Sequence, residues 1–158
     1  MSDFILWEEP ITDRTQSDID VVNYLKGLSW NEMTAEQKQM WTKGLKGALN
    51  EKDLNRIENN IHLLCQVFEI ELITYDGNIP YIPTLSYWQN LLNNVEVIRG
   101  MHSVHTDTPE VPELPINDFS KVNDIEKILL DIYNILLTNF FYESIDDFHM
   151  GEECGLIL

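Results

Sequence analysis

The chain has 158 residues and a formal net charge of −17. This length suits one domain with an ordinary buried core, and 44% hydrophobic with 23% charged residues excludes disorder of the whole chain. The acidity argues against direct binding to DNA, RNA or anionic membranes, because these partners are bound through Lys and Arg.

The negative charge is concentrated at the two ends. Residues 1–20 contain six acids and a single base, Arg14, whereas residues 31–58 contain five acids and five bases. Residues 128–158 contain six acids and no base. No apolar run is long enough for a bilayer span, and the start has no signal-peptide pattern, so we expect the protein to fold in a cytoplasm.

Residues 1–13 have no helical period and are predicted to form an extended N-terminal arm. Thr12 or Thr15 could then cap a first helix that runs to about Leu25 and ends at Gly27.

A second helix is predicted to begin at Thr34, because Thr34-Ala-Glu-Gln37 fits a capping box. Trp41 follows Gln37 by four residues, and we interpret Trp41 and Trp88 as core side chains. Gly44 and Gly47 weaken this helix and indicate a close approach of another backbone.

Residues 51–68 are predicted to form a third helix, with apolar residues at alternating spacings of three and four. A strand-like stretch follows, and Asp76-Gly77 is a turn signal, so a small β-ribbon is expected near residues 69–82. Thr84 is expected to cap a fourth helix that runs to about Arg99.

The C-terminal third is predicted to contain three segments. Residues 101–117 form a Pro-containing connector, read as a stiff spacer or as a docking ligand. Residues 118–140 form a long helix that is too apolar for a lone surface helix, and residues 141–158 form an acidic tail.

The predicted fold class is therefore mainly α. We expect a small helical bundle of about four to five helices with a minor β-ribbon and extended N- and C-terminal arms. Residues 14–100 form its helical body.

Three helices share a spacing of 34 residues. Ile57, Leu91 and Ile125 are related by it, and three further sets of positions obey the same offset. The matching stripes indicate a three-helix bundle within one chain or helical seams between chains. Duplication and coincidence both remain open explanations for the spacing.

Several phrases resemble proteins encoded in prophage and phage genomes of Gram-positive bacteria. The phrases are Trp7-Glu-Glu-Pro10, Thr12-Asp-Arg-Thr15, Trp30-Asn-Glu-Met-Thr34, Gly44-Leu-Lys-Gly-Ala-Leu-Asn50 and Asp53-Leu-Asn-Arg-Ile-Glu-Asn-Asn60, and residues 122–127 look like a second copy of the last. The resemblance implies a structural role near the tail tip, baseplate or fibre attachment, and it implies no catalytic residue.

The candidate interface residues are apolar side chains in the arms and in the last long helix. They are Trp7, Phe4, Leu6, Val122, Ile125, Leu129, Ile132, Leu156 and Ile157. Trp7 is an equally good candidate for packing on its own chain. His102 and His105 would need two further ligands to bind zinc, such as Cys154, His149 or a nearby acid. We interpret them as solvated loop histidines, so no metal, cofactor or catalytic residue is predicted.

These observations predict a structural virion component of a phage tail or tail-like particle, and not an enzyme. It would form a homo-oligomer or hetero-assembly with other tail proteins, without nucleic acid or membrane partners. The alternative is an acidic inhibitor, or nucleic-acid mimic, that blocks a basic enzyme site.

Overall fold

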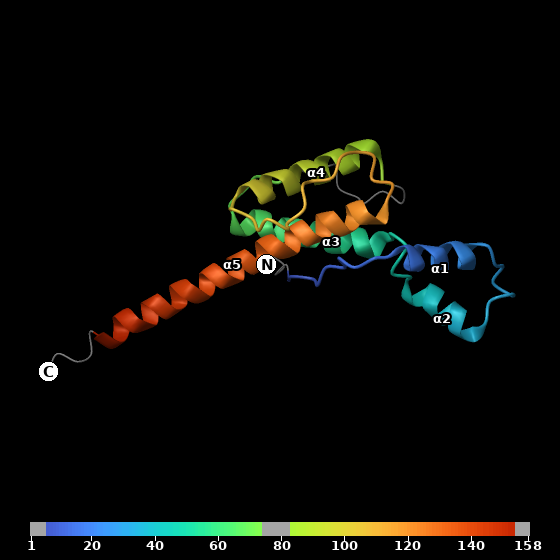
Figure 1. Ribbon diagram of the computed structural model, residues 1–158, viewed down its shortest axis with the longest axis horizontal. Helices are drawn as coiled ribbons and strands as arrows, with labels where there is room; N and C mark the ends of the chain where they lie inside the picture. Colours follow the sequence, from blue (N-terminus) through green and yellow to red (C-terminus); the bar gives the residue numbers. More distant parts are fainter. Residues whose placement is uncertain (1–5, 74–82, 154–158) are drawn as a thin grey trace, which may run out of the picture.

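The computed structural model describes residues 6–73 and 83–153, with side chains in these ranges as far as Asn139. It is mainly helical, as predicted, and these ranges contain five helices and no strand (Figure 1). The helices are α1 (Gln16–Lys26), α2 (Ala35–Lys43), α3 (Glu51–Val67), α4 (Leu85–Gly100) and α5 (Phe119–Glu153). None of them combines the length and the apolar character that crossing a bilayer requires.

The core is a bundle of α3, α4 and the first half of α5, which lie side by side (Figure 1). All four sets of positions related by the 34-residue offset are buried in this one core. They are Leu54, Trp88, Val122; Ile57, Leu91, Ile125; Ile61, Val95, Leu129; and Leu64, Ile98, Ile132. The matching stripes therefore pack against one another within a single chain.

Local sequence explains where the helices begin. Thr34 and Thr84 accept hydrogen bonds from backbone N–H groups in the first turns of α2 and α4, as predicted. Of the two candidates for α1, Thr12 and Thr15, it is Thr15 that caps the helix, and Asn50 caps α3. The predicted capping box of Thr34 with Gln37 is present.

The apolar period of α2 continues to Leu49, but the helix ends earlier, at Lys43. Gly44 has a φ of +92° and turns the chain away. The predicted core position of Trp41 is wrong. The short α2 lies outside the bundle, and this leaves the Trp41 side chain 39% exposed. Trp88 is buried, as predicted.

The predicted β-ribbon is not supported within the described residues, and its turn and return segment, 74–82, lie outside them. At the end of α3 Glu69 has a φ of +55°, and the N–H of Ile70 donates to the carbonyl of Cys65 at 2.9 Å. This turn directs residues 70–73 along the bundle, where Ile73 bonds to the Asn94 side chain instead of to a strand.

The helices α1 and α2 form a lobe at one end of the bundle (Figure 1). Its buried apolar side chains, Val22, Leu25 and Met33, are separate from the bundle core. We call residues 16–50 the α1–α2 lobe.

Helix α5 continues past the predicted end at Phe140 to Glu153. Its distal half runs beyond the ends of α3 and α4, away from the α1–α2 lobe (Figure 1). The connector before α5 lies against the bundle: Thr108 is buried and donates to Asp131 at 2.7 Å.

Candidate partner-binding groove

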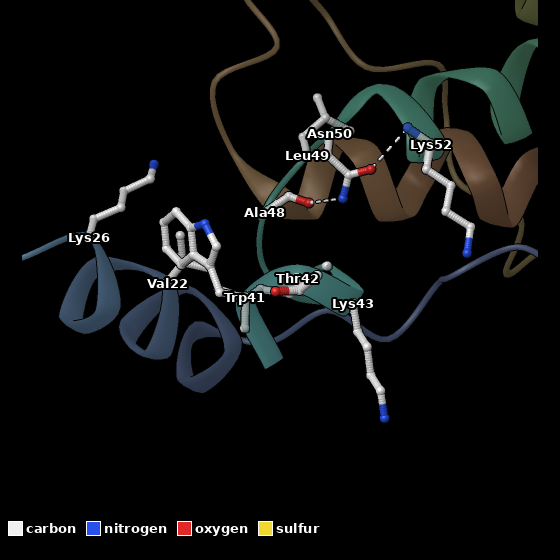
Figure 2. Close-up of a pocket in the computed structure, with 11 residues that line it drawn as sticks. Val22, Lys26, Trp41, Thr42, Lys43, Ala48, Leu49, Asn50 and Lys52 are labelled. Carbon is white, nitrogen blue, oxygen red and sulfur yellow. Dashed lines mark hydrogen bonds between the residues drawn. The ribbon is translucent and has the colours of Figure 1, made fainter. Parts of the chain in front are cut away.

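A groove of about 450 Å³ lies where α1, the end of α2 and the start of α3 meet. Figure 2 shows Trp41 beside Val22 in this groove, with the side chains of Lys26, Lys43 and Lys52 extending from its edges in different directions. Its apolar lining comes from Val22, Trp41, Leu45, Ala48 and Leu49, and its cationic rim from Lys26, Lys43 and Lys52. We call it the lysine-rimmed groove.

The loop between α2 and α3 shapes the groove. A Cβ on Gly47 would lie 2.4 Å from the backbone carbonyl carbon and oxygen of Asp18, so only glycine lets the loop touch the first turn of α1. This is the close backbone approach that the two glycines of this segment predict. Asn50 fixes the other end of the loop, because its amide donates to the Ala48 carbonyl at 3.3 Å and accepts from the Lys52 N–H at 2.9 Å.

The three rim lysines differ from every other cation of the chain. Of the ten Lys and Arg residues, seven have a carboxylate, carbonyl or aromatic partner: Arg14, Lys38, Lys46, Arg56, Arg99, Lys121 and Lys127. Among the described residues, no such partner lies within bonding distance of the side chains of Lys26, Lys43 and Lys52. The lysines without such a partner among the described residues therefore all lie along the edge of the groove.

Helix-end electrostatics accounts for only part of this arrangement. Lys26 and Lys43 lie in the last turns of α1 and α2, where a cation is favoured by the helix dipole. Lys52 lies in the first turn of α3, where the dipole disfavours a cation.

Large apolar side chains are also exposed on the α1–α2 lobe. They are Val21, Tyr24, Trp30, Met40, Trp41 and Leu49, with Tyr24 62% and Trp30 54% exposed. Aromatic residues and Met are enriched at protein interfaces. The lobe thus offers apolar contact area next to a cationic rim.

A second polar constellation lies inside the molecule. Arg14 and Arg56 both bond to Glu126 at 2.8 Å, and both also bond to Asp53, at 3.4 and 2.8 Å. All four residues are buried. Two positive and two negative charges compensate each other, and we call them the buried ionic cluster.

The buried ionic cluster holds the N-terminal arm and does not face solvent. Burial acts to lower the pKa of Arg56, but the hydrogen bonds and charges of Glu126 and Asp53 outweigh it, and the pKa is raised above its usual value. Glu126 also accepts the backbone N–H of Ile11 at 2.6 Å. The cluster therefore joins the arm, α3 and α5.

Asparagine side chains hold extended segments in the same two-bond manner on each bundle helix. The amide of Asn60 accepts from the N–H of Glu8 at 2.9 Å and donates to its carbonyl at 2.7 Å. Asn94, 34 residues later, makes the same pair with Ile73, and Asn123 makes it with Arg14. The arm is thus part of the body from Trp7 to Arg14.

The predicted interface residues fall into three groups. Val122, Ile125, Leu129 and Ile132 form the bundle core of their own chain, where they have at most 4% exposed surface to offer a partner. Trp7 stacks on Tyr133 of the same chain, with ring centroids 3.9 Å apart, whereas Leu6 is 73% exposed. Phe4, Leu156 and Ile157 lie outside the described residues.

Neither the groove nor the buried ionic cluster follows from the sequence reasoning above. The cluster had one signal, Arg14 as the single base in an acidic arm. For the groove, Trp41, Leu45 and Leu49 share a period of four, but that period predicts a buried helical face, and no pattern relates it to the residues of α1 and α3 that complete the lining. His102 packs beside Phe68 with ring centroids 5.4 Å apart, and the described residues contain no group of His, Cys, Asp or Glu that could hold a metal ion.

No protein-family model, curated protein or solved structure matches this chain.

Proposed function

We propose that this protein is an assembly component that binds another protein chain through the lysine-rimmed groove. The observation that carries the proposal is the gathering of Lys26, Lys43 and Lys52, which have no partner among the described residues, around an apolar lining that includes Trp41. A partner segment with carboxylates and apolar side chains would complement both properties.

The construction of the body supports binding rather than chemistry at this site. The groove is lined by apolar side chains and by Thr42 and Asn50, with Lys26, Lys43 and Lys52 at its edge, a composition that suits recognition of a charged segment. The buried ionic cluster and the asparagine bonds hold the arm to the bundle, so the body can present the groove as a fixed surface. A preorganised surface loses less entropy on binding.

Within this function, we propose a structural role in a phage tail or tail-like particle, at a tail tip, baseplate or fibre attachment. The support for this narrower role is the resemblance of most of residues 7–64 and part of residues 118–136 to phage and prophage proteins. The exposed aromatic and apolar side chains of the α1–α2 lobe suit a subunit with neighbours.

Site-specific photo-crosslinking in the producing cell tests the proposal. A photoreactive amino acid replaces Trp41 in the full chain, and the matched control replaces the exposed Asn93 on α4. We expect discrete cross-linked products from position 41, at lower yield when Lys26, Lys43 and Lys52 are changed to Glu. Products that contain tail proteins would support the narrower role.

Two results would contradict the proposal. One is the absence of products from position 41. The other is a set of products that is the same for positions 41 and 93 and does not change with the lysine substitutions.

A further inference from the structure

The distal part of α5 extends past the other two helices of the bundle (Figure 1). Among the side chains of α5 that the structure describes, which end at Asn139, the last fully buried one is Ile132, and Leu137 is already 46% exposed. The helix continues for another 16 residues to Glu153, beyond the ends of α3 and α4 (Figure 1). We call residues 137–153 the distal α5 segment.

The composition of the distal α5 segment is complementary to the lysine-rimmed groove. It contains five acids and no Lys or Arg. The acids are Glu143, Asp146, Asp147, Glu152 and Glu153, and the apolar residues among them are Leu137, Phe140, Phe141, Tyr142, Ile145, Phe148 and Met150. A helical segment with carboxylates and aromatic side chains is the kind of ligand that an apolar groove with an ammonium rim recognises.

This segment does not reach the groove of its own chain. Val122, near the start of α5, lines a smaller cavity together with Ile19 and Gly47, so α5 begins beside the α1–α2 lobe. An α-helix rises about 1.5 Å per residue, which places Glu153 roughly 45 Å further along the axis. The groove and the distal α5 segment thus lie at opposite ends of the molecule (Figure 1).

We propose that the lysine-rimmed groove of one copy binds the distal α5 segment of a second copy. This inference rests on the proposed function and names the partner as this chain itself. The negative charge of the neighbour's segment complements the lysines at the edge of the groove, beside the apolar lining that contains Trp41 and Leu49.

The charges favour this head-to-tail contact over a symmetric one. A two-fold contact between two α1–α2 lobes would bring rim lysines towards rim lysines, which is repulsive. The arm of a second copy is also unsuitable, because residues 7–14 are already held by α3 and α5. A head-to-tail contact uses two different surfaces, so it builds a ring if the rotation closes and a filament if it does not.

A charge swap between two full-length variants tests the inference. The first variant, K26E/K43E/K52E, reverses the rim, and the second, E143K/D146K/D147K, reverses the distal α5 segment. Each variant alone sets like charges against each other, and we expect its self-association to weaken at least about tenfold relative to the native chain. In an equimolar mixture every rim meets a segment of opposite charge, so association should return.

Sedimentation velocity and light scattering over a concentration series measure the association, and circular dichroism checks that each variant is folded. We expect the native chain to associate with increasing concentration, and to do so less at high salt. A native chain that stays monomeric overturns the inference, as does a mixture of folded variants that stays as monomeric as its components.

The outcomes separate this inference from the proposed function. If the native chain is monomeric while position 41 still cross-links a different protein in a lysine-dependent manner, the groove binds a partner that is not a second copy. If neither association nor cross-linking occurs, both proposals fail.

Discussion

The guanidinium of Arg56 and the carboxylate of Glu126 meet in two hydrogen bonds, of 3.0 and 2.8 Å, although the residues lie 70 positions apart in the chain. Glu126 is 1% exposed and also receives Arg14 and the backbone of Ile11. One carboxylate thus connects α3, α5 and the N-terminal arm. The stability of the bundle and the attachment of the arm are therefore both expected to depend on the Glu126 carboxylate.

Replacing Glu126 with Gln keeps the volume of the side chain but removes its charge. Arg14 and Arg56 then share Asp53 as their remaining buried carboxylate, and breaking a buried pair in this way costs about 3–5 kcal/mol. We expect a loss of this size in the free energy of unfolding, measured by urea denaturation. The exposed Glu96→Gln on α4 removes the same charge and should change it by no more than about 0.5 kcal/mol, so equal effects of the two substitutions would contradict the role given to the cluster.

Replacing Asn60 with Ala should release the N-terminal arm. The N–H and carbonyl of Glu8 lose their partner, at a cost of about 1–3 kcal/mol, and the stack of Trp7 on Tyr133 loses its support. Trypsin cleavage after Arg14, which is buried in the intact fold, reports the release. We expect faster cleavage at this bond than in the matched variant Asn55→Ala, since Asn55 is exposed on the same helix, and equal rates would show that the Asn60 amide does not hold the arm.

The Cys65 thiol should be unreactive in the folded protein. It is 3% exposed, and burial raises its pKa above the usual value. The folded state therefore holds the thiol proton more tightly than the unfolded state does. The resulting contribution to the free energy of unfolding is fully present below the pKa of the unfolded thiol, and it is lost as the pH rises through the raised pKa of the folded thiol. In a Cys154→Ser variant we expect slow labelling by a thiol reagent at pH near 8 and fast labelling in urea, and rapid labelling without urea would contradict the buried position.

Periodicity and capping residues were sufficient to predict the helices and the faces that they bury, but not whether these faces pack within one chain or between chains. The apolar stripes that begin at Leu54, Trp88 and Val122 have the spacing that buries one face of a helix. All of their residues are buried in the bundle core. The ends of elements were less predictable. Whether Gly44 interrupts a helix or is tolerated within it depends on its backbone conformation, and the apolar period continues unchanged across it.

The groove and the buried ionic cluster could not be predicted, because each combines residues from segments that no local pattern relates. Arg14, Asp53 and Glu126 come from an extended arm and two helices, and charged residues are expected at the surface unless their partners are known. Trp41 follows the helical period of a core residue, and only the position of α2 outside the bundle makes it a surface residue. The stacking of Trp7 on Tyr133 likewise depends on how the arm crosses α5.

Replacing Gly47 with Ala should loosen the α1–α2 lobe and with it the groove. The added Cβ would lie 2.4 Å from the backbone of Asp18, and neither backbone can yield without moving α1 or the loop. Such overpacking costs about 1–3 kcal/mol, and we expect faster amide hydrogen exchange in α1 while the protection of α4 stays unchanged. Gly100→Ala is the matched control, because nothing lies within 4 Å of its Cβ position and the substitution should leave exchange in α1 as it is. If Gly47→Ala is as harmless as Gly100→Ala, the loop does not depend on this contact, and the shape of the groove must be set by Asn50 and the end of α2 instead.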